Sequence, residues 1–138
     1  MRDSLKLLPL VGLFLLAGCA TTPANVAGAG TQLETRQIQT REYDTLDKAM
    51  TMRSVIATLQ DLGFTIDQAD AELGAITATR LHKHTMRMTV TIVQKDGQRI
   101  AVRANARIGE NSVTDAATYQ DFFVALDKAM FLTLHKVD

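Results

Sequence analysis

The sequence contains one cysteine, Cys19, in the stretch LFLLAGCATTP at residues 13–23. A single thiol can act as a nucleophile, a metal ligand, half of a disulfide, or a site of covalent modification. The surrounding residues favour modification. Arg2 and Lys6 are followed by an apolar run at residues 7–17 and then by small residues. This run is too short to cross a bilayer, which needs about 20 residues, but it suits the hydrophobic region of a secretory signal peptide.

The four residues Leu16-Ala17-Gly18-Cys19 resemble the lipobox of bacterial lipoproteins. The resemblance implies that the Cys19 sulfur receives a diacylglyceryl group, that residues 1–18 are removed, and that the new amino group is acylated. Several acyl chains would anchor the protein firmly, because each buried CH₂ contributes about 0.8 kcal/mol. Ala20 in place of an aspartate implies, by the same resemblance, the outer membrane of a Gram-negative cell. An incidental or buried cysteine behind an ordinary signal peptide is the alternative.

A second group of chemically active residues is basic. Positions 80–107 hold seven lysines and arginines and one aspartate, whereas positions 42–79 hold seven acids and two basic residues. Side chains two positions apart on a strand share a face. We therefore expect a basic face made of Arg87, Arg99, Arg103 and Arg107. Such a face could bind an acidic protein partner or anionic lipid headgroups, or it could simply be a solvated surface that keeps the sheet soluble.

Other polar clusters carry weaker signals. His82-Lys83-His84 places two imidazoles on one face of a strand, a spacing that metal ligands can use, but no third ligand lies nearby in the sequence. The acids at positions 67–72 lack the order of a calcium loop and are typical of a turn. No serine lies in a nucleophile elbow, and no phosphate-binding loop occurs. We expect no metal, no catalytic residues and no cofactor besides the covalent lipid, and hence no enzyme.

The elements that position these residues begin after a tether. Residues 20–33 are rich in Ala, Gly and Thr, which predicts a lipidated N-terminus and flexible tether over residues 19–33 and a periplasmic domain over 34–138. A strand is predicted at 34–44. A helix follows to residue 62, with Asp44 as its capping residue and Gly63 as the left-handed residue that ends it.

The rest of the chain is predicted to form four strands and a second helix. The turn AELG at residues 71–74 joins one hairpin, and Asp96-Gly97 joins another whose strands alternate between apolar and polar residues. The last helix is expected to be capped by Ser112 or Thr114. The order is therefore β-α-β-β-β-β-α, which predicts an α+β domain with one antiparallel sheet and two helices packed on one face.

The stretch LDKAMTMRSVIATLQDLGFTIDQADAELGAITATR at residues 46–80 is similar to a domain of known proteins. A helix that ends in Leu-Gly-Phe-Thr-Ile, an acidic turn and a Gly-x-Ile-x-Ala strand resemble the helix-grip domains found in a lipoprotein component of the outer-membrane β-barrel assembly machine. That lipoprotein has two such domains behind a long unstructured segment, whereas this chain has room for one. The resemblance implies a helix-grip-like fold and a non-enzymatic role in the envelope, and it assigns no functional residue.

Together these observations predict an outer-membrane lipoprotein whose domain lies in the periplasm. The 138 residues suffice for one domain, and the 15 basic and 15 acidic residues do not indicate a nucleic-acid binder. We expect a binding or accessory module for an envelope protein partner, in envelope assembly or in a transport complex. The alternative is a carrier or sensor that holds a lipid or small molecule between helix and sheet.

Overall fold

The computed structural model describes residues 26–135. Over this range the chain forms one antiparallel sheet of six strands and three helices, which confirms the predicted α+β class. The elements are α1 (Val26–Ile38), β1 (Thr40–Tyr43), α2 (Lys48–Asp61), β2 (Thr65–Asp70), β3 (Ala75–Leu81), β4 (Thr85–Lys95), β5 (Arg99–Ile108), β6 (Asn111–Ser112) and α3 (Ala116–Leu134). The predicted order is present, with α1 and the short β6 as additions.

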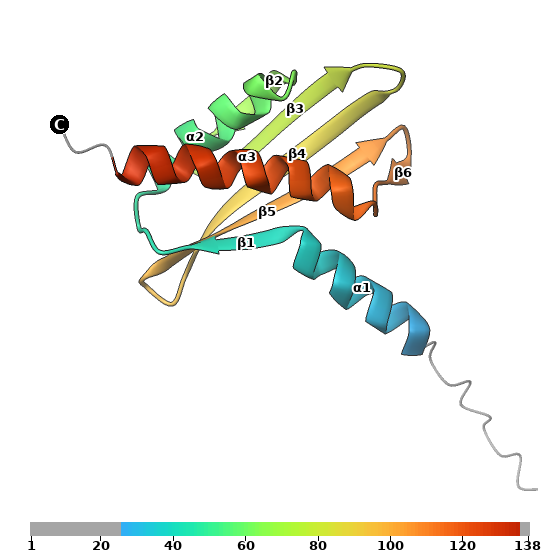
Figure 1. Ribbon diagram of the computed structural model, residues 1–138, viewed down its shortest axis with the longest axis horizontal. Helices are drawn as coiled ribbons and strands as arrows, with labels where there is room; N and C mark the ends of the chain where they lie inside the picture. Colours follow the sequence, from blue (N-terminus) through green and yellow to red (C-terminus); the bar gives the residue numbers. More distant parts are fainter. Residues whose placement is uncertain (1–25, 136–138) are drawn as a thin grey trace, which may run out of the picture.

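The sheet has the strand order β1-β5-β4-β3-β2, and β6 pairs with the end of β5. Helices α2 and α3 lie side by side on one face, as Figure 1 shows. Alternate residues of the strands point into the layer between helices and sheet, which large side chains fill. The fully buried ones include Leu59, Ile76, Met88, Ile92, Ile100, Tyr119, Phe122, Phe123, Leu126 and Met130. We call the opposite side of the sheet the outer face.

Helix α2 ends as the sequence predicts but begins later. Gly63 has a φ of 83°, and Phe64 N–H donates to the Leu59 carbonyl at 2.9 Å. This is the Schellman geometry, and burial of both Leu59 and Phe64 supplies its hydrophobic contact. The predicted cap Asp44 is wrong. Asp47 caps the helix, because its carboxylate accepts from Met50 N–H at 2.8 Å.

The hairpin between β4 and β5 turns at Asp96-Gly97, as predicted. Both residues have positive φ, 51° and 68°, and the Gln98 N–H donates to the Lys95 carbonyl at 3.3 Å, which closes the turn. The turn sets a register in which Lys95 lies opposite Arg99 and, at the far end of the ladder, Arg87 lies opposite Arg107. Because the register is antiparallel and unbroken, the outer side chains of β4 and β5 lie next to each other in pairs.

Helix α3 is fixed to the sheet by the hydroxyl group of Tyr119. This buried hydroxyl donates to the Val113 carbonyl at 2.6 Å and accepts from Ala106 N–H at 3.1 Å and from the Gln39 amide at 3.0 Å. It lies beside residues 104–106 of β5, between the part of β5 that pairs with β1 and the part that pairs with β6. The side chain therefore satisfies backbone groups that a strand would otherwise bind. The helix begins at Asp115, which caps Thr118 N–H, and not at Ser112 or Thr114.

Helix α1 differs from the sequence-based expectation. Residues from Val26 onward, predicted as an irregular tether up to residue 33 and a strand from Glu34, are helical through Ile38. The segment was not recognised because its alanines and glycines show no helical spacing of large apolar residues. Its C-terminal end is held by packing of Ile38 against the core and by the buried Gln39. The helix projects from the β1 edge of the sheet (Figure 1), and the division of the chain into tether and domain stays a prediction.

Candidate functional site

The four predicted basic residues all lie exposed on the outer face. Arg87 belongs to the central strand β4, and Arg99, Arg103 and Arg107 follow one another along β5. We refer to them as the outer arginines. Threonines surround them: Thr40, Thr77, Thr79, Thr85, Thr89 and Thr91 occupy outer positions of β1, β3 and β4. The sheet thus presents guanidinium groups on a background of hydroxyl groups and β-branched methyl groups.

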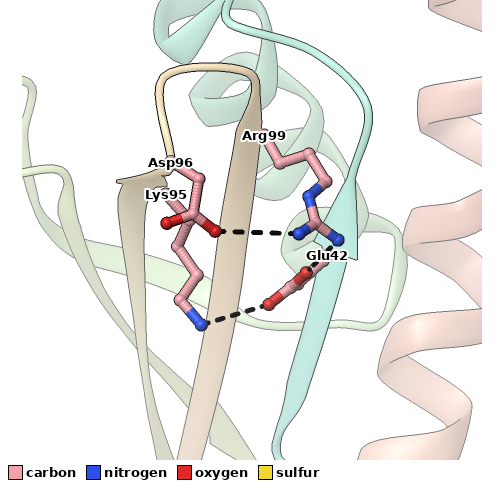
Figure 2. A network of polar contacts seen from close by, with 4 residues as sticks. All are labelled: Glu42, Lys95, Asp96 and Arg99. Carbon is pink, nitrogen blue, oxygen red and sulfur yellow. Dashed lines mark hydrogen bonds and ion pairs between the residues drawn. The ribbon is translucent and has the colours of Figure 1, made fainter.

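At one end of this face the positive charge is neutralised within the chain. Glu42 on β1 places its carboxylate between two cations, 3.2 Å from Lys95 Nζ and 2.8 Å from an Arg99 guanidinium nitrogen. Asp96 in the turn contacts the same guanidinium at 3.7 Å. Figure 2 shows this network of two cations and two carboxylates. Arg99 is therefore part of a structural ion cluster and is the least available of the outer arginines.

Arg103 has no such partner. It lies opposite Thr91 on β4 and Thr40 on β1, and no acidic side chain of residues 31–135 forms an ion pair with it. It also lines a groove of about 800 Å³ between α1 and the edge of the sheet. Hydroxyl and amide side chains such as Thr35, Asn105 and Thr114 line the same groove. Arg103 thus joins the outer face to this groove.

The far end of the face holds the pair Arg87 and Arg107. The two residues are direct cross-strand neighbours, and like charges in that position are destabilising. They line a hollow of about 460 Å³ together with Thr85, Thr89 and the 109–110 turn. Arg107 is oriented by the Glu110 carbonyl, which accepts from it at 2.8 Å. The Glu110 carboxylate lies 3.4 Å from the same nitrogen, on a side chain that is fully exposed to solvent.

Arg80, which contributes to the basic segment in the sequence, does not belong to this face. It lies opposite Met86 on the inner side of the sheet and donates to the Leu62 carbonyl at 3.2 Å. Its guanidinium also stacks 4.7 Å from the centre of the Phe64 ring. Placing a cation at the carboxyl end of α2 is favourable for the helix dipole. Its role is therefore structural.

A half-buried polar contact connects β1 to α3. Asp127 accepts from the Tyr43 hydroxyl at 2.7 Å and pairs with Arg41. Burial raises the pKa of Tyr43 above its usual range, and the hydrogen bond to Asp127 raises this pKa further. Tyr43 therefore stays neutral and acts as a hydrogen-bond donor. This contact stabilises the edge of the sheet and faces away from the outer arginines.

The remaining candidates do not converge. His82, Lys83 and His84 lie in the exposed β3–β4 turn, and residues 31–135 contain no cluster of three potential metal ligands. In the acidic segment, Asp70 accepts from Leu73 N–H at 2.8 Å within the β2–β3 turn. Cys19 and the predicted lipobox lie outside the described residues. Within the described range, no helix has both the length and the apolarity needed to span a membrane.

Sequence reasoning missed the counter-ion Glu42. It precedes Lys95 by 53 residues, and nothing local in the sequence indicates that β1 lies beside β5. Comparison with protein-family models gives no match, and no curated protein matches the sequence. The candidate site therefore has to be judged by its own geometry.

Proposed function

We propose that this protein is an outer-membrane-anchored periplasmic lipoprotein that works as a non-enzymatic docking module for an envelope protein. The anchor is the lipid on Cys19, for which the support is the sequence Leu16-Ala17-Gly18-Cys19 behind a signal-like segment. The domain would serve as a binding or accessory part of an assembly or transport complex. Tethering to a surface raises the effective concentration of the domain for a membrane-bound partner.

The observation that carries the docking proposal is the charge on the outer face. Arg87 and Arg103 are exposed and have no acidic partner in residues 31–135, although Lys95 and Arg99 on the same ladder are neutralised. Unpaired charge on an exposed sheet face favours encounter with a partner of opposite charge. Reversing Arg87 and Arg103 should therefore reduce partner cross-linking, whereas reversing the exposed Arg53 on α2 should not.

The alternative of a ligand carrier has less support. A carrier needs a cavity between the helices and the sheet, and that layer is filled by large side chains such as Phe122 and Leu126, both fully buried. The two hollows described above lie outside this layer, at the α1 edge and on the outer face. The packing therefore favours a docking module over a carrier.

The anchor is tested by the variant Cys19→Ala. Cells grown with a labelled fatty acid should incorporate the label into the wild-type protein and not into the variant, because the sulfur and the new amino terminus that accept acyl chains are lost. The variant should also accumulate at the mass of the unprocessed precursor. Labelling and processing equal to those of the wild type would refute the lipoprotein assignment. Ser54→Ala, a change on α2, serves as a control that leaves labelling intact.

A further inference from the structure

The β4–β5 ladder contains two directly opposed pairs of cations. Lys95 faces Arg99 beside the turn, and Arg87 faces Arg107 at the other end. Each pair is unfavourable by itself, because the side chains of cross-strand neighbours lie only about 5 Å apart at Cβ. The sheet therefore contains two places where like charges repel each other across neighbouring strands.

In the pair Lys95 and Arg99, a carboxylate of the same chain offsets the repulsion. Glu42 contacts both cations of the pair, at 3.2 Å and 2.8 Å, and Asp96 adds a second negative charge (Figure 2). Two cations meet two anions. The Lys95–Glu42 contact is a charge-assisted hydrogen bond, and the two contacts of Arg99 are ion pairs. A glutamate side chain that reaches in from a neighbouring strand is thus the form in which this fold compensates such a pair.

The second pair lacks an equivalent of Glu42. No acidic residue of the described chain pairs with Arg87, and Arg107 contacts only Glu110, whose carboxylate is fully exposed. Counting direct ion pairs, one net positive charge therefore remains; the Asp67 carboxylate on β2 accepts from the hydroxyl of Thr79, the cross-strand neighbour of Arg87, and forms no ion pair with the guanidinium. The Arg107 guanidinium is already oriented by the Glu110 carbonyl, so that ordering it costs a ligand little. A hollow of about 460 Å³, with Thr85 and Thr89 in its lining, lies beside the two guanidinium groups.

We infer that the hollow between Arg87 and Arg107 is a subsite for a carboxylate, and that an aspartate or glutamate side chain of the docking partner occupies it as Glu42 occupies the other pair. This inference rests on the proposed docking function and names the chemistry of the contact. A single carboxylate matches the one uncompensated charge. The threonine hydroxyls next to the guanidinium groups can donate to its second oxygen.

Glu110 has a specific part in this arrangement. Its carbonyl orients Arg107, while its carboxylate, 3.4 Å from the same nitrogen, is the group that an incoming carboxylate would compete with. Replacing Glu110 with glutamine keeps the carbonyl and removes the competing charge. We therefore expect Glu110→Gln to increase affinity for a carboxylate, a gain that misfolding cannot produce.

The test is the binding of an end-blocked, fluorescein-labelled hexaglutamate peptide to the full mature chain in a zwitterionic detergent, followed by fluorescence anisotropy. Arg87→Gln and Arg107→Gln should each raise Kd about tenfold, as expected for loss of one charge-assisted contact. Arg99→Gln, which removes an equal charge from the compensated pair, should change Kd less than about twofold. Glu110→Gln should lower Kd about threefold. A hexaglutamine peptide should not bind.

Three results would overturn the inference. They are equal weakening by Arg99→Gln and Arg87→Gln, no gain from Glu110→Gln, and binding of inorganic phosphate at lower concentration than the hexaglutamate peptide, which would make the hollow a phosphate site. The peptide assay needs neither the anchor nor the native partner. If the peptide assay fails, the carboxylate subsite is refuted but the docking function is not. If the partner docks through another face, the docking proposal is refuted but the peptide results do not change.

Discussion

At the scale of single residues, Tyr119 carries the most structural consequence. Its hydroxyl group is bonded to Ala106, Val113 and Gln39 in a region without solvent access. Buried polar groups that lose their partner retain the full cost of having left water. The hydroxyl therefore has a structural role beyond the apolar packing of the ring.

We expect Tyr119→Phe to lower the free energy of unfolding by about 2–4 kcal/mol, because an amide N–H, a carbonyl and a side-chain amide all lose one partner. Urea denaturation followed by circular dichroism measures this. Tyr43→Phe is the matched control. It removes a single hydrogen bond at a half-buried position, where Asp127 keeps its pairing with Arg41, and should cost about 1 kcal/mol. Equal losses in both variants would contradict the role assigned to Tyr119.

At the scale of elements, local signals in the sequence correctly predicted a helix end and a hairpin turn, whereas contacts between distant segments could not be predicted. The stop of α2 at Gly63 and the turn at Asp96-Gly97 follow from backbone conformations that a few neighbouring residues determine. The caps Asp47 and Asp115 were missed because other polar residues stand within a few positions of each. Helix α1 was missed because its sequence has no helical apolar pattern. Its C-terminal end is held instead by tertiary contacts of Ile38 and Gln39.

The outer face shows the same division. Alternation along β4 and β5 correctly placed the outer arginines on one side of the sheet. It could not show that Glu42 reaches Arg99, since this depends on β1 joining the edge of β5. The sequence therefore predicted which residues are exposed and not which of them are free to bind. The structure shifts the candidate contact away from Arg99, toward Arg87, Arg103 and Arg107.

The β2–β3 hairpin supplies a prediction at this scale. Gly74 is buried with a φ of 69°, and a Cβ there would lie 2.6 Å from the Ile92 carbonyl oxygen on β4. Gly63 has a similar φ, but its added Cβ would meet only the Arg80 side chain at 3.7 Å. We expect Gly63→Ala to cost about 1–2 kcal/mol, which is the strain of left-handed backbone alone.

Gly74→Ala should cost clearly more, about 3 kcal/mol or above, because the backbone of β3 must also move away from β4. Thermal and urea unfolding of both variants, with Gly97→Ala as a further control in open space, would establish the order. If Gly74→Ala were no more destabilising than Gly63→Ala, this would contradict the close contact between Gly74 and the β4 backbone.

At the scale of the whole molecule, the two packed helices and the outer arginines lie on opposite sides of the sheet. Helices α2 and α3 cover one face of the sheet and enclose the core (Figure 1), whereas the other face exposes the outer arginines. Acidic residues Asp67 and Asp70 lie on β2, at the edge of the sheet farthest from β5. The neutral total of the sequence therefore conceals an uneven distribution of charge. In the proposed docking, this distribution would orient the domain toward an acidic partner.

Contact with the partner through the outer face is the central claim. The most direct measurement is cross-linking in the native envelope from a photoreactive residue at position 91, which lies among the outer arginines, with quantification by mass spectrometry. We expect the double variant Arg87→Glu, Arg103→Glu to lower the yield of the partner cross-link about tenfold or more, and Arg53→Glu on α2 to leave it within about twofold. A wild-type yield from the double variant, or an equal loss in Arg53→Glu, would contradict docking through this face.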